Sequence, residues 1–174
     1  MRETWNGLLK IIEIQHLDRD GTVLWKDSNV HNVLHVNGEQ FLLNALFVGG
    51  NSGFYIPDNY YFGLDARGSV LAADTITDLA GEPQTNGYSR QLVSSLNQFS
   101  VAIFGGIYQA VSPIVSFGAS GGSWGPVTNL FLTTDLGSAG TLISSVPLSQ
   151  SLTVIDGQVV SLKMGLSLRD VPPA

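Results

Sequence analysis

Ionised side chains are scarce in the second half of this chain. After position 90 the charged residues are limited to Asp135, Asp156, Lys163, Arg169 and Asp170, while the first 90 positions hold the other 17 of 22. A soluble domain usually carries charge on about a quarter of its residues. Here Ser, Thr, Asn, Gln and Gly separate short apolar runs instead. Such a surface does not repel its neighbours, so we expect it to contact other subunits.

Cysteine is absent, which excludes disulfides and thiolate chemistry. Basic residues are few, because 8 Lys and Arg stand against 14 Asp and Glu, for a formal net charge of −6. They form no stripe, so neither nucleic acid nor a membrane surface is expected as a partner. No apolar run approaches the roughly 20 residues of a membrane span, and Met1–Trp5 lacks an apolar signal core. We therefore expect synthesis and folding in the cytoplasm.

The length of 174 residues suits one ordinary domain with a core of its own. A hydrophobic content of 44% with 20 Gly and 7 Pro excludes a disordered or a collagen-like chain. No linker-like stretch interrupts the sequence. We therefore predict a single β-rich domain over residues 1–174, in which residues 1–7 and 169–174 are extended arms that order only on a neighbour.

Most of the chain has a pattern typical of β-structure. Residues 8–17 predict a strand, and the turn residues Asp18-Arg19-Asp20-Gly21 lead into a second strand over 22–26, which makes an N-terminal hairpin. Tyr60–Leu64 is typical of a buried strand. Further strands, about ten residues apart, are predicted over 29–33, 89–94, 100–104, 108–117, 128–133, 141–146 and 159–168. This spacing predicts a mainly β fold, either a single-domain β-sandwich or a jelly-roll-like fold.

One short α-helix is predicted over about residues 37–47. Asn37 is a suitable N-cap, and Glu39 lies in the first turn. Apolar residues then recur at helical spacing, at Phe41, Leu42, Ala45 and Leu46. A single helical turn is expected over 74–79, with Asp74 as its cap.

The nucleophile-elbow pattern G-x-S-x-G occurs twice, around Ser120 and around Ser123. A working elbow needs a strand before it, a helix after it, and a histidine later in the chain. Here Pro126 and an apolar β-type run follow, and all the histidines precede both serines. We interpret the two matches as a Gly/Ser-rich loop between strands.

Metal-site patterns are equally incomplete. His31 and His35 share one face as a helix or as a strand, but a metal site needs further ligands, and His16 has no partner in the sequence. We interpret these histidines as hydrogen-bonded polar residues. The run Asp18-x-Asp20-Gly21 copies part of a calcium loop, but position 12 of that loop would be Asn29 instead of Glu. A hairpin turn explains it better, although a weak surface Ca²⁺ site elsewhere stays open.

Nothing in the spacing of Glu13, Glu39 and Glu82 selects a carboxylate pair for glycoside cleavage. Phosphate-binding glycine motifs are also missing. We therefore predict no catalytic, cofactor-binding or metal-binding residue, no cofactor, and no enzymatic activity.

Three segments carry a resemblance to a known class of protein. They are Trp25-Lys26-Asp27-Ser28-Asn29 leading into the helix Gly38-Glu39-Gln40-Phe41-Leu42-Leu43-Asn44-Ala45-Leu46-Phe47, the run Tyr61-Phe62-Gly63-Leu64-Asp65, and Gly81-Glu82-Pro83 through Gly87-Tyr88-Ser89-Arg90. With the Gly/Ser-rich β half that follows, they resemble small virion structural proteins of tailed bacteriophages, over roughly residues 25–168. The resemblance implies a β-sandwich or jelly-roll subunit of a symmetric oligomer, without catalytic residues.

The leading expectation is a capsid decoration (cement) or minor capsid subunit in the virion. It would act as a homo-oligomer, with a trimer favoured, against the major capsid protein or other virion proteins. The alternative is a tail, baseplate or fibre component. A further alternative is a stand-alone carbohydrate-binding module, for which Tyr55, Tyr60 and Trp124 are the candidate platform. Trp5 and Trp124 suit either an interface or the core.

Overall fold

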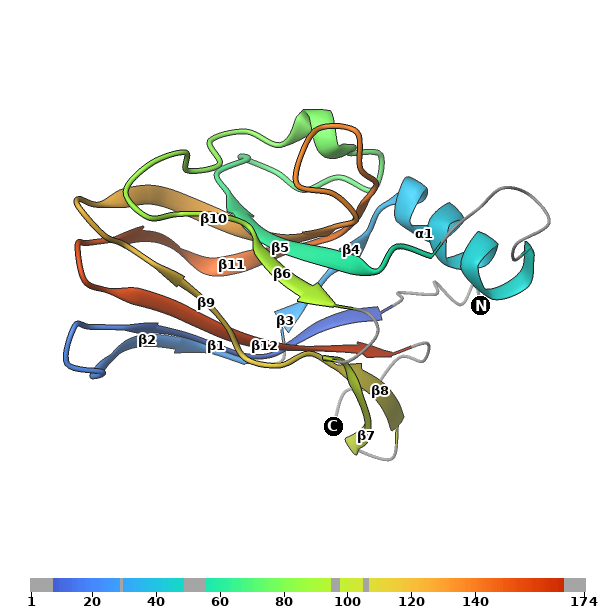
Figure 1. Ribbon diagram of the computed structural model, residues 1–174, viewed down its shortest axis with the longest axis horizontal. Helices are drawn as coiled ribbons and strands as arrows, with labels where there is room; N and C mark the ends of the chain where they lie inside the picture. The colour runs from blue at the N-terminus through green and yellow to red at the C-terminus, as the bar shows by residue number, and fades with distance from the viewer. Residues whose placement is uncertain (1–7, 29, 49–55, 95–97, 105–106, 168–174) are drawn as a thin grey trace.

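The computed structural model describes residues 8–28, 30–48, 56–94, 98–104 and 107–167. Two antiparallel sheets face each other as a β-sandwich (Figure 1). Sheet A has the order β2-β1-β12-β8-β7, with β3 also paired to β1 and β9 also paired to β12. Its strands are β1 Leu8–Leu17, β2 Val23–Asp27, β3 Val30–His31, β7 Ser100–Phe104, β8 Ile107–Val111, β9 Val115–Gly118 and β12 Val159–Ser167. The predicted N-terminal hairpin, β1–β2, is confirmed.

Sheet B has the order β4-β11-β10-β5-β6. Its strands are β4 Val33–Leu34, β5 Asn59–Asp65, β6 Gln91–Ser94, β10 Trp124–Thr133 and β11 Leu142–Val154. The chain passes from sheet A to sheet B between β3 and β4, which are separated by Asn32 alone. The mainly β fold and the β-sandwich prediction are confirmed.

Alternation along the strands fills the space between the sheets. On β12 the side chains of Val160, Leu162 and Met164 are fully or almost fully buried, while Ser161 and Lys163 between them are half-buried. Sheet B contributes large, fully buried side chains to the same core, at Phe62, Leu64, Leu130 and Leu152. Because each such side chain stabilises the fold by roughly 1.5–3 kcal/mol, this core fixes the register of both sheets.

The helix α1, Val36–Leu43, continues into a π-helical turn, Asn44–Val48. Its N-cap is His35, so the prediction of Asn37 as the cap is wrong. Phe41 is buried, but Leu46 is 55% exposed, so the predicted apolar stripe holds only for the first half. The wider π turn breaks the 3.6-residue spacing on which the stripe depended.

Several other boundaries differ from the prediction. The turn near residue 75 is a 3₁₀-helix, Ile76–Asp78, capped by Thr75 through a capping box, and Asp74 is not the cap. The strand predicted over 108–117 is interrupted at Ser112–Ile114, where Pro113 lacks the N–H that a continuous ladder needs. β11 extends well past the predicted 141–146, to Val154. The predicted arms, residues 1–7 and 169–174, lie outside the described residues.

Candidate functional site

The two G-x-S-x-G matches form a loop, as predicted. Ser120 and Ser123 lie between β9 and β10, and a strand rather than a helix follows them. Asn86 holds this loop from the opposite side, because its side-chain amide donates to the Ser123 carbonyl oxygen at 2.6 Å and its own carbonyl accepts from the Ser120 amide at 2.8 Å. This is not the strand–turn–helix geometry of a nucleophile elbow.

The two histidines whose side chains the structure describes, His16 and His35, act as hydrogen-bonded structural residues. His16 pairs with the side chain of Gln158 at 2.9 Å. His35 is fully buried and bonds the Leu71 carbonyl oxygen at 2.9 Å and the Ser145 hydroxyl at 2.8 Å. The side chain of His31 lies outside the described residues. Within the described ranges, no three His, Asp or Glu side chains gather into a group that could hold a metal ion.

The calcium-like run Asp18–Gly21 is a hairpin turn. Gly21 has a positive φ of 86°, which favours glycine, and its amide donates to the Asp18 carbonyl oxygen at 2.9 Å. The Thr22 amide donates to the carboxylate of Asp20 at 2.9 Å, and this hydrogen bond lowers the pKa of Asp20. The remaining polar side chains of the turn bond the β11–β12 connection: Asp18 accepts from Gln158, and Arg19 pairs with Asp156.

A buried polar network joins the end of β5 to β11 and to the loop that covers sheet B (Figure 1). Arg67, only 6% exposed, donates to the carboxylates of Asp65 and Asp74 and to the Ser145 hydroxyl. Burial raises the pKa of Asp65, and the Arg67 guanidinium opposes that shift. Burial and the same guanidinium lower the pKa of His35. One guanidinium thus pairs with two carboxylates, and these contacts hold the loop in place.

A second ion pair, between Glu82 and Arg90, holds the end of this loop that precedes β6. Glu82, which the sequence leaves without a partner, accepts two hydrogen bonds from Arg90, at 2.8 and 2.7 Å, and one from the Tyr88 hydroxyl at 3.1 Å. The guanidinium of Arg90 lies 5.1 Å from the ring centroid of Phe131. Hydrogen bonding to Glu82 raises the pKa of Arg90, while burial raises that of Tyr88. Here too the charges are paired inside the molecule. The other predicted carboxylates lie apart: Glu13 pairs with Lys26, and Glu39 is in α1.

The candidate aromatic platform is not assembled. Trp124 is 4% exposed, stacks edge-on against Tyr88 at 5.4 Å, and donates its indole N–H to the Gly118 carbonyl oxygen. Trp124 is therefore a core residue. Tyr60 is half-buried, while Tyr55 and Trp5 lie outside the described residues.

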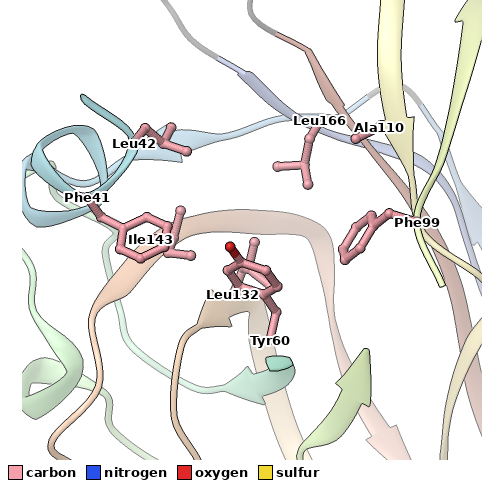
Figure 2. A pocket seen from close by; sticks show the side chains of 8 residues that line it. All are labelled: Phe41, Leu42, Tyr60, Phe99, Ala110, Leu132, Ile143 and Leu166. Atoms are coloured by element: carbon pink, nitrogen blue, oxygen red, sulfur yellow. The ribbon is translucent and has the colours of Figure 1, made fainter. Parts of the chain in front are cut away.

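An apolar pocket opens at the end of the sandwich nearest α1, with a volume of about 250 Å³ (Figure 2). Side chains from both sheets and from α1 converge on it, and the hydroxyl of Tyr60 is the polar group among them. Tyr60 meets Phe41 and Phe99 edge-to-face, with ring centroids 6.3 and 6.2 Å apart. The lining residues are Phe41, Leu42, Tyr60, Phe99, Ala110, Leu132, Ile143 and Leu166.

Exposed apolar side chains lie on two elements: one directly follows α1 in the chain, and the other includes the pocket residue Ala110. The π-helical turn after α1 exposes Leu46 and Phe47, the latter at 80%. The β7–β8 hairpin exposes Val101, Ile103 and Tyr108. We name the pocket and these side chains the apolar end. The sequence indicated part of the apolar end, because the strand predicted over 100–104 has no charge. Only the tertiary structure shows which face of that strand is uncovered.

A comparison with models of protein families identifies the family of this chain. A family model described as Podophage GP4 fiber I protein gp80 matches residues 34–167, from the end of β4 to the end of β12. The chain belongs to this family. No curated protein and no solved structure matches it. The resemblance to phage virion structural proteins is thus confirmed, and the fibre alternative fits better than capsid decoration. Among the described residues, no helix is long and apolar enough to cross a membrane.

Proposed function

We propose that this chain is a structural subunit of a phage fibre and that it acts by contact with other virion proteins, without catalysis. The observation that carries the proposal is the family match, which spans 134 of the 174 residues (34 to 167) and includes all strands from β5 to β12. The ranking of the sequence-based alternatives is thereby reversed, with a fibre component ahead of a capsid decoration.

The arrangement of polar groups supports a structural role. The described ionic clusters around Arg67 and Arg90 are closed, because each cation is paired to carboxylates and hydrogen-bonded to the sheet or loop beside it. Catalytic sites instead leave an acid, base or nucleophile facing a cleft. The pocket at the apolar end is lined by apolar residues and a single hydroxyl, which suits burial against protein better than chemistry.

Homo-oligomeric assembly is part of the proposal. Fibres repeat one subunit many times, and soluble homo-oligomers usually adopt closed symmetry. A trimer is the assembly we expect, and the proposed further partners are other virion proteins at the point where the fibre attaches.

Localisation on the virion tests the proposal directly. Gold-labelled antibody against this chain, imaged by electron microscopy on purified particles, should mark the fibres. Antibody pre-absorbed with the purified chain serves as the control. Label distributed over the capsid surface instead would favour capsid decoration over the fibre function. Loss of label from particles stripped of their fibres provides a second, independent readout.

A further inference from the structure

The core-facing side of sheet A continues past sheet B onto the β7–β8 hairpin. On β12 the core-facing residues alternate, and Leu166 is the last of them in the described chain. Leu166 pairs with Ala110 on β8, and Ala110 pairs with Val101 on β7. Ile103 and Tyr108 form the next pair along the same face. Directly opposed residues of an antiparallel pair share a face, so all of these side chains continue the inner surface of the sheet.

Sheet B does not cover this part of the face. Val101 is 74% exposed, Ile103 59% and Tyr108 70%. β8 joins β12 only through its last residues, Ala110 and Val111, so β7 and the start of β8 extend beyond the sandwich (Figure 1). Single exposed apolar residues are ordinary, but three adjacent ones on a core-facing surface, beside an apolar pocket, are typical of an interaction site.

Among the described strands, β7 lies at an edge of sheet A and lacks the usual protection against pairing. Edge strands are commonly guarded by charge, proline or cover from another element. The edge strand β2 carries Lys26 and Asp27, and β6 at the edge of sheet B lies beside β9. β7, with the sequence Ser-Val-Ala-Ile-Phe, has no charge and no proline.

We propose that this face of the hairpin, formed by Val101, Ile103 and Tyr108, lies at the symmetry axis of the homo-oligomer and contacts the same face of the neighbouring copies of the chain. The inference rests on the proposed fibre function and names the surface through which copies meet. Two copies, each with a net charge of −6, repel one another over most of their surface. Residues 91–134 contain no charged residue, so two hairpins that meet bring no like charges of their own together.

The oligomeric mass of the full chain tests the proposal. Size-exclusion chromatography with light scattering should give an oligomer for the wild type and at least a tenfold weaker association for Ile103→Asp. The matched control is Ile155→Asp, because Ile155 is 56% exposed and lies in the β11–β12 connection, at the opposite end of the sandwich (Figure 1). Circular dichroism and thermal unfolding verify that both variants keep the fold.

Cross-linking gives a second readout that does not depend on weakening the assembly. Since the chain has no cysteine, Val101→Cys introduces a single thiol. Mild oxidation should convert it into a disulfide-linked dimer, whereas Ile155→Cys should stay uncross-linked. A monomeric wild type at micromolar concentration, or an Ile103→Asp variant that keeps the wild-type mass, would overturn the proposal. If the antibody labels the fibres on the virion but one of these two results is obtained, the interface is rejected and the fibre function is retained.

Discussion

Replacing Arg67 with methionine tests how the buried network holds the loop over sheet B. The side chain of Arg67 is 5% exposed, and its guanidinium pairs with two carboxylates. The side chain of Asp65 is fully buried, and that of Asp74 is 13% exposed. Methionine has a similar length and no charge, so it keeps much of the packing and removes the pairing. One carboxylate oxygen of Asp65 already lacks a hydrogen-bond partner in the described residues, and Arg67 is the cation paired with this carboxylate.

The expected loss follows from the uncompensated carboxylate. Breaking a buried ion pair by removing one partner costs about 3–5 kcal/mol of unfolding free energy. For a domain of this size, that corresponds to a fall in Tm of roughly 6–20 °C. Urea unfolding followed by circular dichroism measures the change. The control is Arg19→Met, because Arg19 and Asp156 lie 3.6 Å apart with side chains 73% and 50% exposed, and a pair so exposed contributes about 1 kcal/mol or less.

Two further measurements separate charge from packing. Adding Asp65→Asn to Arg67→Met should restore part of the lost stability, because the buried charge is then gone. Lowering the pH should have the same effect. The pKa of Asp65 is already above its ordinary value of 3.8, and it rises further without Arg67, so the carboxyl becomes neutral as the pH falls toward that pKa. A loss for Arg67→Met no larger than that for Arg19→Met would refute this account of the network.

Two other substitutions follow from the same structure. Gly38→Ala should cost roughly 1–3 kcal/mol of stability, because a Cβ there collides with the backbone of Ile143, whereas Gly68→Ala, with open space around it, should be neutral in the same thermal unfolding assay. His35→Gln should reduce the loss of stability on acidification. The pKa of His35 lies below its ordinary 6.5, so the unfolded chain binds the proton first and stability falls as the pH drops below 6.5. Equal falls in Tm between pH 7 and pH 5 for the wild type and the variant would contradict this.

The sequence predicted the strands well where a local pattern determined them. β1 and β7 begin and end where the pattern placed them, because alternation and turn residues bound both. Failures came where tertiary contacts override local preference. β11 runs on to Val154 because it pairs with the long β10 beside it, and no local signal states the length of a partner strand. The π turn that ends α1 has no sequence signature of its own.

The site was harder to predict than the fold. Arg67 was not singled out in the sequence, because its partners Asp74 and Ser145 are brought to it only by folding, 7 and 78 positions away. His35 could be described as a hydrogen-bonded histidine, but its burial depends on the loop that covers β11. The sequence left Trp124 as either an interface residue or a core residue, and its contact with Tyr88 shows that it belongs to the core.

The scarcity of charge after residue 90 has two different physical causes. Residues 129–133 of β10 and 142–146 of β11 lack charge because both of their faces are covered within the molecule: one by the core, and the other by the loop whose Ile76 and Leu79 pack on Phe131 and Leu142. That part of the pattern needs no partner subunit. The β7–β8 hairpin is equally uncharged, yet no described element covers its apolar face. Burial within the molecule therefore explains the lack of charge in the covered parts of β10 and β11. It does not explain the lack of charge in the hairpin, so the inference of a neighbouring copy applies to that surface.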